Sequence, residues 1–359
     1  MDILAGTAYR QDVEKEDMDE FERLISEPQF DGPKRHHYVS RFYLEGFADR
    51  EGLLHVFDRK TGEIRPQTPK DTTVIGHFYT FIDKNEQRRF ELEKLFGIIE
   101  NSACSALKKI NNGGRLSQKE REYLSLFIAM AAIRTPAAFE EARHVEQEIH
   151  RADIKLRMAN KQQAYFIAKK VSPSGATEEE LHKLAIDAYR MVNEDCFTVE
   201  VSDELARQAS LKQWVPVAEV IYNRDWTVVE APDGFEYITS DSPAVLVPLE
   251  KFKDDPLGFG SLHAHVLFPL TRKRALVMNG DGARFRRMKV SADQVHRFNS
   301  KLAADCYRFV IGAQAEYLSK IVDKLGLIGT SWSPRTDVDI ATHPISGKKG
   351  IRVRGRGQR

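Results

Sequence analysis

The sequence predicts an α+β protein with a mostly antiparallel sheet built from N- and C-terminal segments and a large central helical insertion. Residues 53–81 and 224–312 contain short apolar runs of β character, separated by turn residues. Between them, over about 89–222, apolar residues recur at spacings of three and four, which is typical of helices. The simplest assembly is one α+β domain over 32–330. Two domains divided near residue 223 are the alternative.

The first β region contains a predicted hairpin. LLHVFD at 53–58 is an apolar strand, Arg59-Lys60-Thr61-Gly62 is a turn, and EIRPQ returns as its partner. Because proline cannot donate a backbone hydrogen bond, Pro66 and Pro69 place the returning strand at the edge of the sheet.

The central region predicts several helices. One covers about 89–110, and a capping box at Ser117–Glu120 opens a second that is apolar nearly all round and therefore central. Residues 137–170 predict one long, charged helix, either solvated or used for homo-oligomer contacts. A second capping box, Thr177–Glu180, opens a helix to about 192, and a further helix follows at about 202–222.

In the C-terminal region, DWTVVEAP and EYITS around Asp233-Gly234 predict a second hairpin. Strands follow at 263–270 and 274–279, and Ser291–Gln294 caps a helix to about Asp305. We expect an acidic arm at 1–31 with a short helix near 11–26. The basic tail at 331–359 is expected to be disordered.

Composition restricts the class of protein. The net charge of +1 and a hydrophobic content of 42% are typical of a soluble globular chain. No segment is long and apolar enough for a membrane span, and the N-terminus lacks the apolar core of a signal peptide. Three dispersed cysteines fit reduced thiols, so a cytoplasmic protein is expected. Walker A, GxGxxG, HExxH, GxSxG and zinc-finger patterns are absent, which disfavours nucleotide-driven motors, dinucleotide oxidoreductases and common hydrolases.

The strongest candidates for catalysis are His37 and Arg41. If both lie on one helix, Arg41 sits one turn above His37 and can hold an anion while His37 transfers a proton. In the alternative, His37 caps the helix and Arg41 pairs with a carboxylate. Asp241 follows a predicted strand within Ser240-Asp241-Ser242-Pro243, where it either points into a cleft or forms an Asx turn. Ser240 is a candidate substrate contact.

Four other residues are candidates for substrate binding: Tyr43, His77, Tyr79 and Arg134. His77 and Tyr79 alternate on one strand face, and both also suit packing and hydrogen bonding. Arg134 ends the buried helix, where it either forms an ion pair or binds an anion. No metal ligands are assigned. His263 and His265 share a strand face, but no third ligand is evident nearby.

Several segments resemble the bacterial domain-of-unknown-function family 4238. The first is HYVSRFYL at 37–44, in which Ser40 replaces the proline typical of that family. The others are FDRKTG at 57–62, FYT at 78–80, and YITSDSP at 237–243 followed by FPL at 268–270. The resemblance covers about 34–330, selects His37 over its neighbour His36, and implies a bacterial protein with one shared domain. It implies no catalytic residues.

Two functions follow from these patterns. The first is an enzyme that hydrolyses a phosphate-containing substrate, which could be nucleic acid. In it, His37 acts as acid/base, Arg41 holds the phosphate, and Asp241 is a base or a ligand of a divalent metal. The basic runs at 272–274 and 284–289 suit phosphate contacts. The second is a non-catalytic binding or interaction module, related to stress or phage defence. The missing catalytic signatures and the charged helix favour it.

Overall fold

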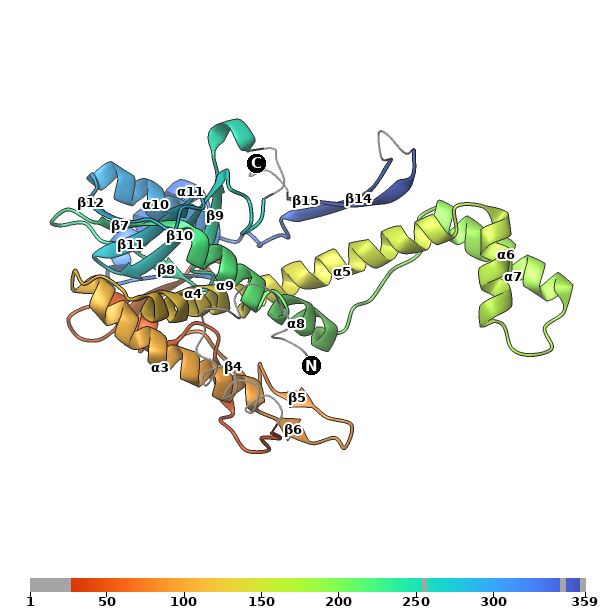
Figure 1. Cartoon of the computed structure of the whole chain (residues 1–359), viewed down its shortest axis with the longest axis horizontal. Coiled ribbons are helices and arrows are strands. Elements are labelled where there is room, and N and C mark those ends of the chain that lie inside the picture. The colour runs from red at the N-terminus through yellow and green to blue at the C-terminus, as the bar shows by residue number, and fades with distance from the viewer. Residues whose placement is uncertain (1–26, 254–256, 343–346, 356–359) are drawn as a thin grey trace. The chain divides into compact units, whose positions relative to one another are not determined.

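A computed structural model describes residues 27–253, 257–342 and 347–355 of the chain (Figure 1). Within this range the chain forms two compact units. The first comprises residues 27–139, 207–253 and 257–333, and the second comprises residues 140–206 with the described part of 334–359. Helices and mostly antiparallel strands confirm the predicted α+β class. No helix of the described ranges is both long and apolar enough to cross a membrane.

The first unit contains a four-stranded antiparallel sheet in the order β3 (Ile64–Gln67), β2 (Leu54–Asp58), β13 (Phe309–Gly312) and β8 (Thr239–Ser240). The predicted hairpin β2–β3 is confirmed. β13 lies between β2 and β8, so this sheet joins segments from both ends of the chain, as predicted.

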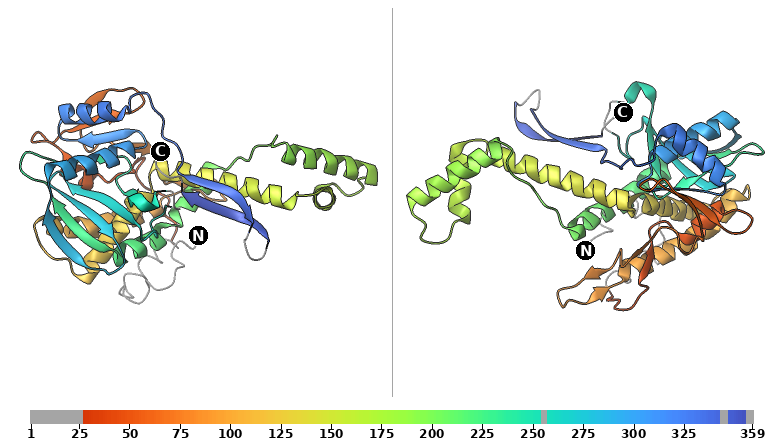
Figure 2. Two further views of the ribbon diagram at one scale, coloured as in Figure 1. Left: turned by 90° about the horizontal axis from the view of Figure 1, so that it is seen from above. Right: turned by 180° about the vertical axis from the view of Figure 1, so that it is seen from behind.

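The late strands also form a second sheet, which the sequence did not predict separately. Its order is β12 (Phe285–Lys289), β7 (Asp225–Glu230), β11 (Arg274–Asn279), β10 (Ala264–Thr271) and β9 (Val245–Pro248). Only β12 and β7 run parallel; the other neighbours are antiparallel. Figure 2 shows these green to blue strands from two further sides.

The predicted hairpin across Asp233-Gly234 is wrong. β7 pairs with β11 and β12, whereas β8 pairs with β13. The N–H groups of Ala231 and Tyr237 donate to the carbonyls of Lys273 and Arg272, at 3.0 and 2.7 Å. The turn between β10 and β11 thus accepts hydrogen bonds from N–H groups that the predicted hairpin across Asp233-Gly234 would have used.

Helices α3 (Glu91–Asn111), α4 (Gln118–Ile133) and α9 (Trp214–Asn223) form the helical core of the first unit. α4 is buried nearly all round, and its predicted capping box at Ser117 is present. α8 (Asp203–Leu211) precedes α9. α10 (Ala292–Ala304), with its predicted capping box at Ser291, and α11 (Ala315–Leu325) complete the helices of this part.

The remaining elements of the first unit are short. β1 (Arg35–His37) pairs with β4 (Val74–Gly76), and β5 (Phe81–Ile82) pairs with β6 (Arg88–Arg89). α2 (Arg41–Leu44) continues into the 3-10 helix η2 (Glu45–Phe47), and η3 (Glu250–Phe252) is a second 3-10 turn.

In the second unit, the single helix predicted for 137–170 is wrong. α5 covers Pro136–Arg157, and a separate helix, α6 (Lys161–Val171), begins after Asn160. Asn160 has an extended backbone, and its side chain caps α6 by accepting a hydrogen bond from the Gln163 N–H. α7 (Glu178–Asn193) follows with the predicted capping box at Thr177.

The tail predicted to be disordered contains a hairpin, β14 (Thr336–Thr342) with β15 (Lys349–Gly355). Ile340 pairs with Ile351 across the strands, and Asp339 forms ion pairs with Arg352 and Arg354. Cross-strand apolar and charged pairs stabilise such a ribbon. The predicted helix at 11–26, with most of the acidic arm, lies outside the described residues.

Candidate active site

His37 and Arg41 do not lie on one helix, so the predicted helical pair is wrong. His37 ends β1, and its Nε2 donates to the Lys70 carbonyl at 3.1 Å. The helix begins only at Arg41, because Ser40 is its N-cap with φ −58° and ψ 134°. Arg41 is exposed and pairs with Glu45 at 3.1 Å. The alternative stated for Arg41, pairing with a carboxylate, is thus present.

Asp241 is fully buried and holds a turn of the backbone. Its carboxylate accepts from the N–H groups of Tyr307, Arg308 and Phe309 at 2.9, 2.7 and 2.9 Å. Burial raises the pKa of Asp241 to about 7, and these donors oppose the rise. Across the described chain, no hydrogen bond or ion pair joins His37, Arg41 and Asp241 to one another. The predicted catalytic trio is therefore not supported.

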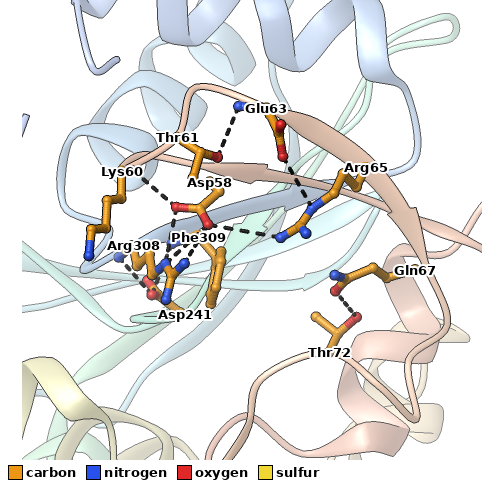
Figure 3. A network of polar contacts seen from close by, with 10 residues as sticks. All are labelled: Asp58, Lys60, Thr61, Glu63, Arg65, Gln67, Thr72, Asp241, Arg308 and Phe309. Atoms are coloured by element: carbon orange, nitrogen blue, oxygen red, sulfur yellow. Dashed lines mark hydrogen bonds and ion pairs between the residues drawn. The ribbon is translucent and has the colours of Figure 1, made fainter. Parts of the chain in front are cut away.

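Asp58 holds the same turn from another side (Figure 3). Its carboxylate accepts from Arg308 Nη2 at 2.7 Å and from the Lys60 N–H at 3.0 Å. Burial alone would raise the pKa of Asp58. Hydrogen bonds from Arg308 outweigh this effect and hold the pKa below its usual value. Figure 3 shows Asp58 and Asp241 converging on Arg308, so this network fixes β13 beside β2.

Tyr43 and Ser240 are also used inside the fold. The Tyr43 hydroxyl donates to the Pro269 carbonyl and shares a hydrogen bond with Thr239 Oγ1, each at 2.9 Å. Ser240 Oγ accepts from the Ser242 N–H at 3.1 Å. Both residues are buried, so contact of either with a substrate does not fit this structure.

The other predicted residues meet in one place, which we call the Arg134 cluster. It combines residues of β1, the α2 cap, the segment after β4, α3 and the end of α4. Its members are His36, His37, Ser40, His77, Tyr79, Glu93, Glu100 and Arg134.

Arg134 is the centre of this cluster and is 1% exposed. Its Nη2 donates to Ser40 Oγ and to Glu100 Oε1, both at 2.6 Å, while Ser40 Oγ donates to the same Glu100 oxygen at 2.7 Å. Burial alone would lower the pKa of Arg134, but Glu100 outweighs it and raises that pKa. Arg134 Nε is buried without a hydrogen-bond partner. The ion pair predicted as one alternative for Arg134 is thus present.

Two aromatic rings enclose the guanidinium. Its Cζ lies 5.2 Å from the ring centre of Phe96 and 6.0 Å from that of Tyr79. The Tyr79 hydroxyl donates to the Arg134 carbonyl at 2.8 Å. Because burial raises the pKa of Tyr79 well above its usual value, this hydroxyl stays protonated. Tyr79 therefore positions Arg134.

His36 is held as a neutral ring. Its Nδ1 accepts from the Tyr79 N–H at 3.0 Å, so its Nε2 carries the proton and donates to the Pro33 carbonyl at 2.8 Å. Burial lowers the pKa of His36, in agreement with this assignment. Since the Nδ1 lone pair is already used, the 3.9 Å separation from Glu93 Oε2 is not an ion pair.

Glu93 is the group in the cluster best suited to proton transfer. Burial raises its pKa to about 7; Arg134 opposes this rise and the Glu100 charge adds to it. Glu93 Oε2 is buried without a hydrogen-bond partner, yet the side chain as a whole is 24% exposed. A carboxyl group half ionised at neutral pH can both accept and donate a proton.

His37 supplies a second partly exposed group. Burial lowers its pKa, so the ring is neutral at pH 7. With Nε2 donating to Lys70, the Nδ1 lone pair is the acceptor. Glu100 and Arg134 both act electrostatically on this ring. The predicted residues His37 and Arg134 therefore share one electrostatic environment.

Backbone strain marks the same region. Thr73 and His77, which bracket β4, have φ values of 55° and 54°. Side chains other than glycine rarely adopt this left-handed region, and such strain often occurs at functional sites. Arg88 Nη1 donates to His77 Nε2 at 3.4 Å, so Nδ1 carries the proton and is buried without a partner.

Sequence reasoning missed Ser40, Glu93 and Glu100 as members of the cluster. A usable signal existed for the two glutamates: they are seven residues apart, on one face of α3, beside its buried apolar residues. For Ser40 the signal was its position immediately before α2, because serine is a preferred residue at the start of a helix.

Acidic side chains pair with part of the two basic runs predicted to contact phosphate, whereas Arg286 and Lys289 remain exposed. Arg272 and Lys273 lie near Glu236, at 3.7 and 3.6 Å. Arg284 pairs with Asp225 at 2.5 Å, and Arg287 donates to two backbone carbonyls. Within the described ranges, no three His, Cys, Asp or Glu side chains are arranged to hold a metal ion.

The fold and site define an α+β protein whose polar centre lies between a short β pair and a helical core. The family described as protein of unknown function (DUF4238) matches residues 35–316. The chain belongs to this family, in agreement with the resemblance of its motifs. No curated protein and no solved structure matches the chain.

Proposed function

We propose that the Arg134 cluster is the active site of a hydrolase that works by general acid–base catalysis. One observation carries the proposal: Glu93 combines a pKa of about 7, an unpartnered oxygen and partial exposure. Structural carboxylates are normally hydrogen-bonded, whereas catalytic ones have a pKa near the working pH.

The residues would divide the work as follows. Glu93 takes a proton from the attacking water and returns it to the leaving group. His37, through its Nδ1 lone pair, hydrogen-bonds the substrate. Arg134 is a positioning residue, because it is buried and fixes the charge beside Glu93 without reaching solvent.

The local charges favour an uncharged ester or amide over a polyanion. Glu93 and Glu100 both place negative charge beside the site, and Glu100 already balances Arg134. Acidic partners of Arg272, Lys273 and Arg284 reduce the positive charge of the basic runs, which weakens the case for a nucleic-acid partner. A phosphate-containing substrate remains the competing proposal.

The test uses the full chain with p-nitrophenyl esters, p-nitrophenyl phosphate and bis-p-nitrophenyl phosphate, with and without Mg²⁺ or Mn²⁺. We expect ester turnover to fall by about 10²–10⁴ in Glu93→Gln. Glu45→Gln, an exposed glutamate paired with Arg41, is the matched control and should keep full activity. Equal turnover by wild type and Glu93→Gln, or no turnover at all, would contradict the proposal.

A non-catalytic interaction module is the second candidate. One observation favours it: the α6–α7 helices carry several exposed apolar side chains. If the protein is such a module, Glu93→Gln should leave its binding to a partner unchanged. Replacing the exposed apolar side chains of α6 or α7 should abolish that binding.

A further inference from the structure

Helices α6 and α7 form a hairpin with very little core of its own. Its buried cluster consists of three alanines, Ala164, Ala168 and Ala185, with Tyr165 and Tyr189 packed against it. Leu181 and Val192 are buried as well, whereas five other large apolar side chains of the hairpin are exposed. Those exposed are Phe166, Val171, Leu184, Ile186 and Met191, of which Val171 is 72% exposed and Phe166 58%. Exposed apolar groups gathered on so small an element indicate an interaction surface.

Each helix places an exposed apolar residue beside charge. On α6, Lys169 and Lys170 follow Phe166 at three and four residues, so they lie next to it on the surface. On α7, Asp187 lies between Leu184 and Met191 on one face, three residues after the first and four before the second.

The two helices carry opposite charge. α6 contains Lys161, Lys169 and Lys170 and no acidic residue. α7 contains Glu178, Glu179, Glu180 and Asp187 against Lys183 and Arg190, so its net charge is −2. Among the described contacts, none involves the side chains of Lys169, Lys170, Glu179 or Asp187, so these charges are available to a partner.

We propose that this hairpin is a self-association surface, on which two copies of the chain pack around a twofold axis. A twofold axis brings the same patch of both copies together. The basic α6 of each copy can then face the acidic α7 of the other, so every complementary contact occurs twice. The apolar side chains form the centre of the interface and the charges form its rim.

A second copy fits better than another occupant because the patch is complementary to itself. A partner with an acidic surface would match α6 and repel α7, and a basic partner would do the reverse. The inference is independent of the proposed catalytic function, since all these residues are distant in sequence from the Arg134 cluster.

The test measures the mass of the full chain in solution by light scattering after size exclusion. One variant carries Lys169→Glu and Lys170→Glu; the other carries Glu179→Lys and Asp187→Lys. Wild type should form a dimer, and each variant alone should dissociate at least about tenfold more readily, because like charges then face each other. An equimolar mixture of the two variants should dimerise again, since both contacts of the mixed dimer are complementary.

The matched control is Lys320→Glu with Lys324→Glu on α11, two exposed lysines outside the hairpin. It should remain dimeric. Circular dichroism should show equal helix content in all variants. A monomeric wild type, dimers that survive either charge reversal, or a mixture that fails to dimerise would each overturn the proposal.

Discussion

Asp58 and Asp241 bind the same residue from two sides: Asp58 accepts from the Arg308 guanidinium at 2.7 Å, and Asp241 accepts from its N–H at 2.7 Å. Both aspartates belong to segments that resemble the family motifs. The shared role of these two motif pieces is therefore to fix the start of β13. This accounts for Asp241, which the sequence suggested as either a catalytic residue or part of a turn, through its hydrogen bonds to the backbone.

Asp241→Asn should destabilise the fold by about 2–4 kcal/mol, because an amide cannot accept all three backbone N–H groups and its own N–H₂ opposes them. Urea unfolding at pH 7 measures the loss. Asp233→Asn, in an exposed turn, is the control and should change stability by less than about 0.5 kcal/mol. A stable Asp241→Asn protein that has lost hydrolytic activity would instead restore Asp241 as a catalytic residue.

Arg134→Ala should lower the free energy of unfolding by about 2–4 kcal/mol. The change removes a buried guanidinium from between two rings, takes away the charged partner of Glu100, and leaves Ser40 Oγ without its donor. Arg41→Ala is the matched control: it removes an exposed arginine from a surface ion pair and should cost at most about 0.5 kcal/mol. Similar losses in both variants would show that the cluster is not held by Arg134.

Glu93 should make stability depend on pH. Its pKa is raised from 4.5 in the unfolded chain to about 7 in the fold, so the folded state binds more protons between these values. Its contribution is fully present below pH 4.5 and is lost as pH rises through 7. Glu93→Gln should therefore be more stable than wild type at pH 8, on the order of 2 kcal/mol, and the difference should vanish near pH 4.5. Thermal unfolding across pH 4.5–8 measures this, and a constant difference would refute the shift.

Ser40→Pro should be tolerated by the backbone, because φ at Ser40 is −58°, close to the value that proline fixes. The variant loses the hydroxyl that links Arg134 to Glu100 and also the Ser40 N–H, which donates no hydrogen bond among the described contacts. Ser40→Ala isolates that loss, and we expect both variants to lose about 1 kcal/mol. Chemical denaturation compares them. A Ser40→Pro protein much less stable than Ser40→Ala would show that the N-cap backbone cannot accept proline.

Local signals predicted local structure well. The three capping boxes at Ser117, Thr177 and Ser291 are present, because a side chain and a backbone N–H three residues apart decide them. The β2–β3 hairpin was predicted for the same reason. The break at Asn160 could have been predicted from its capping potential but was hidden by the continuous charged pattern.

Pairing between distant segments could not be predicted. β7 pairs with β11 and β12 rather than with its sequence neighbour, and Trp226 and Val228 of this interior strand are buried. The site shows the same limit. Arg134 was a candidate, but its partner Glu100 lies on another helix. Which carboxylate contacts a buried arginine depends on packing between helices.

The position of β13 between β2 and β8 also constrains the order of assembly. During synthesis, β2 and β3 leave the ribosome early, yet the strand that covers the inner edge of β2 is among the last to appear. Contacts so distant in sequence form slowly, and an uncovered strand edge is prone to pair wrongly in the meantime. Until Phe309–Gly312 has been synthesised, the inner edge of Leu54–Asp58 therefore has no strand beside it.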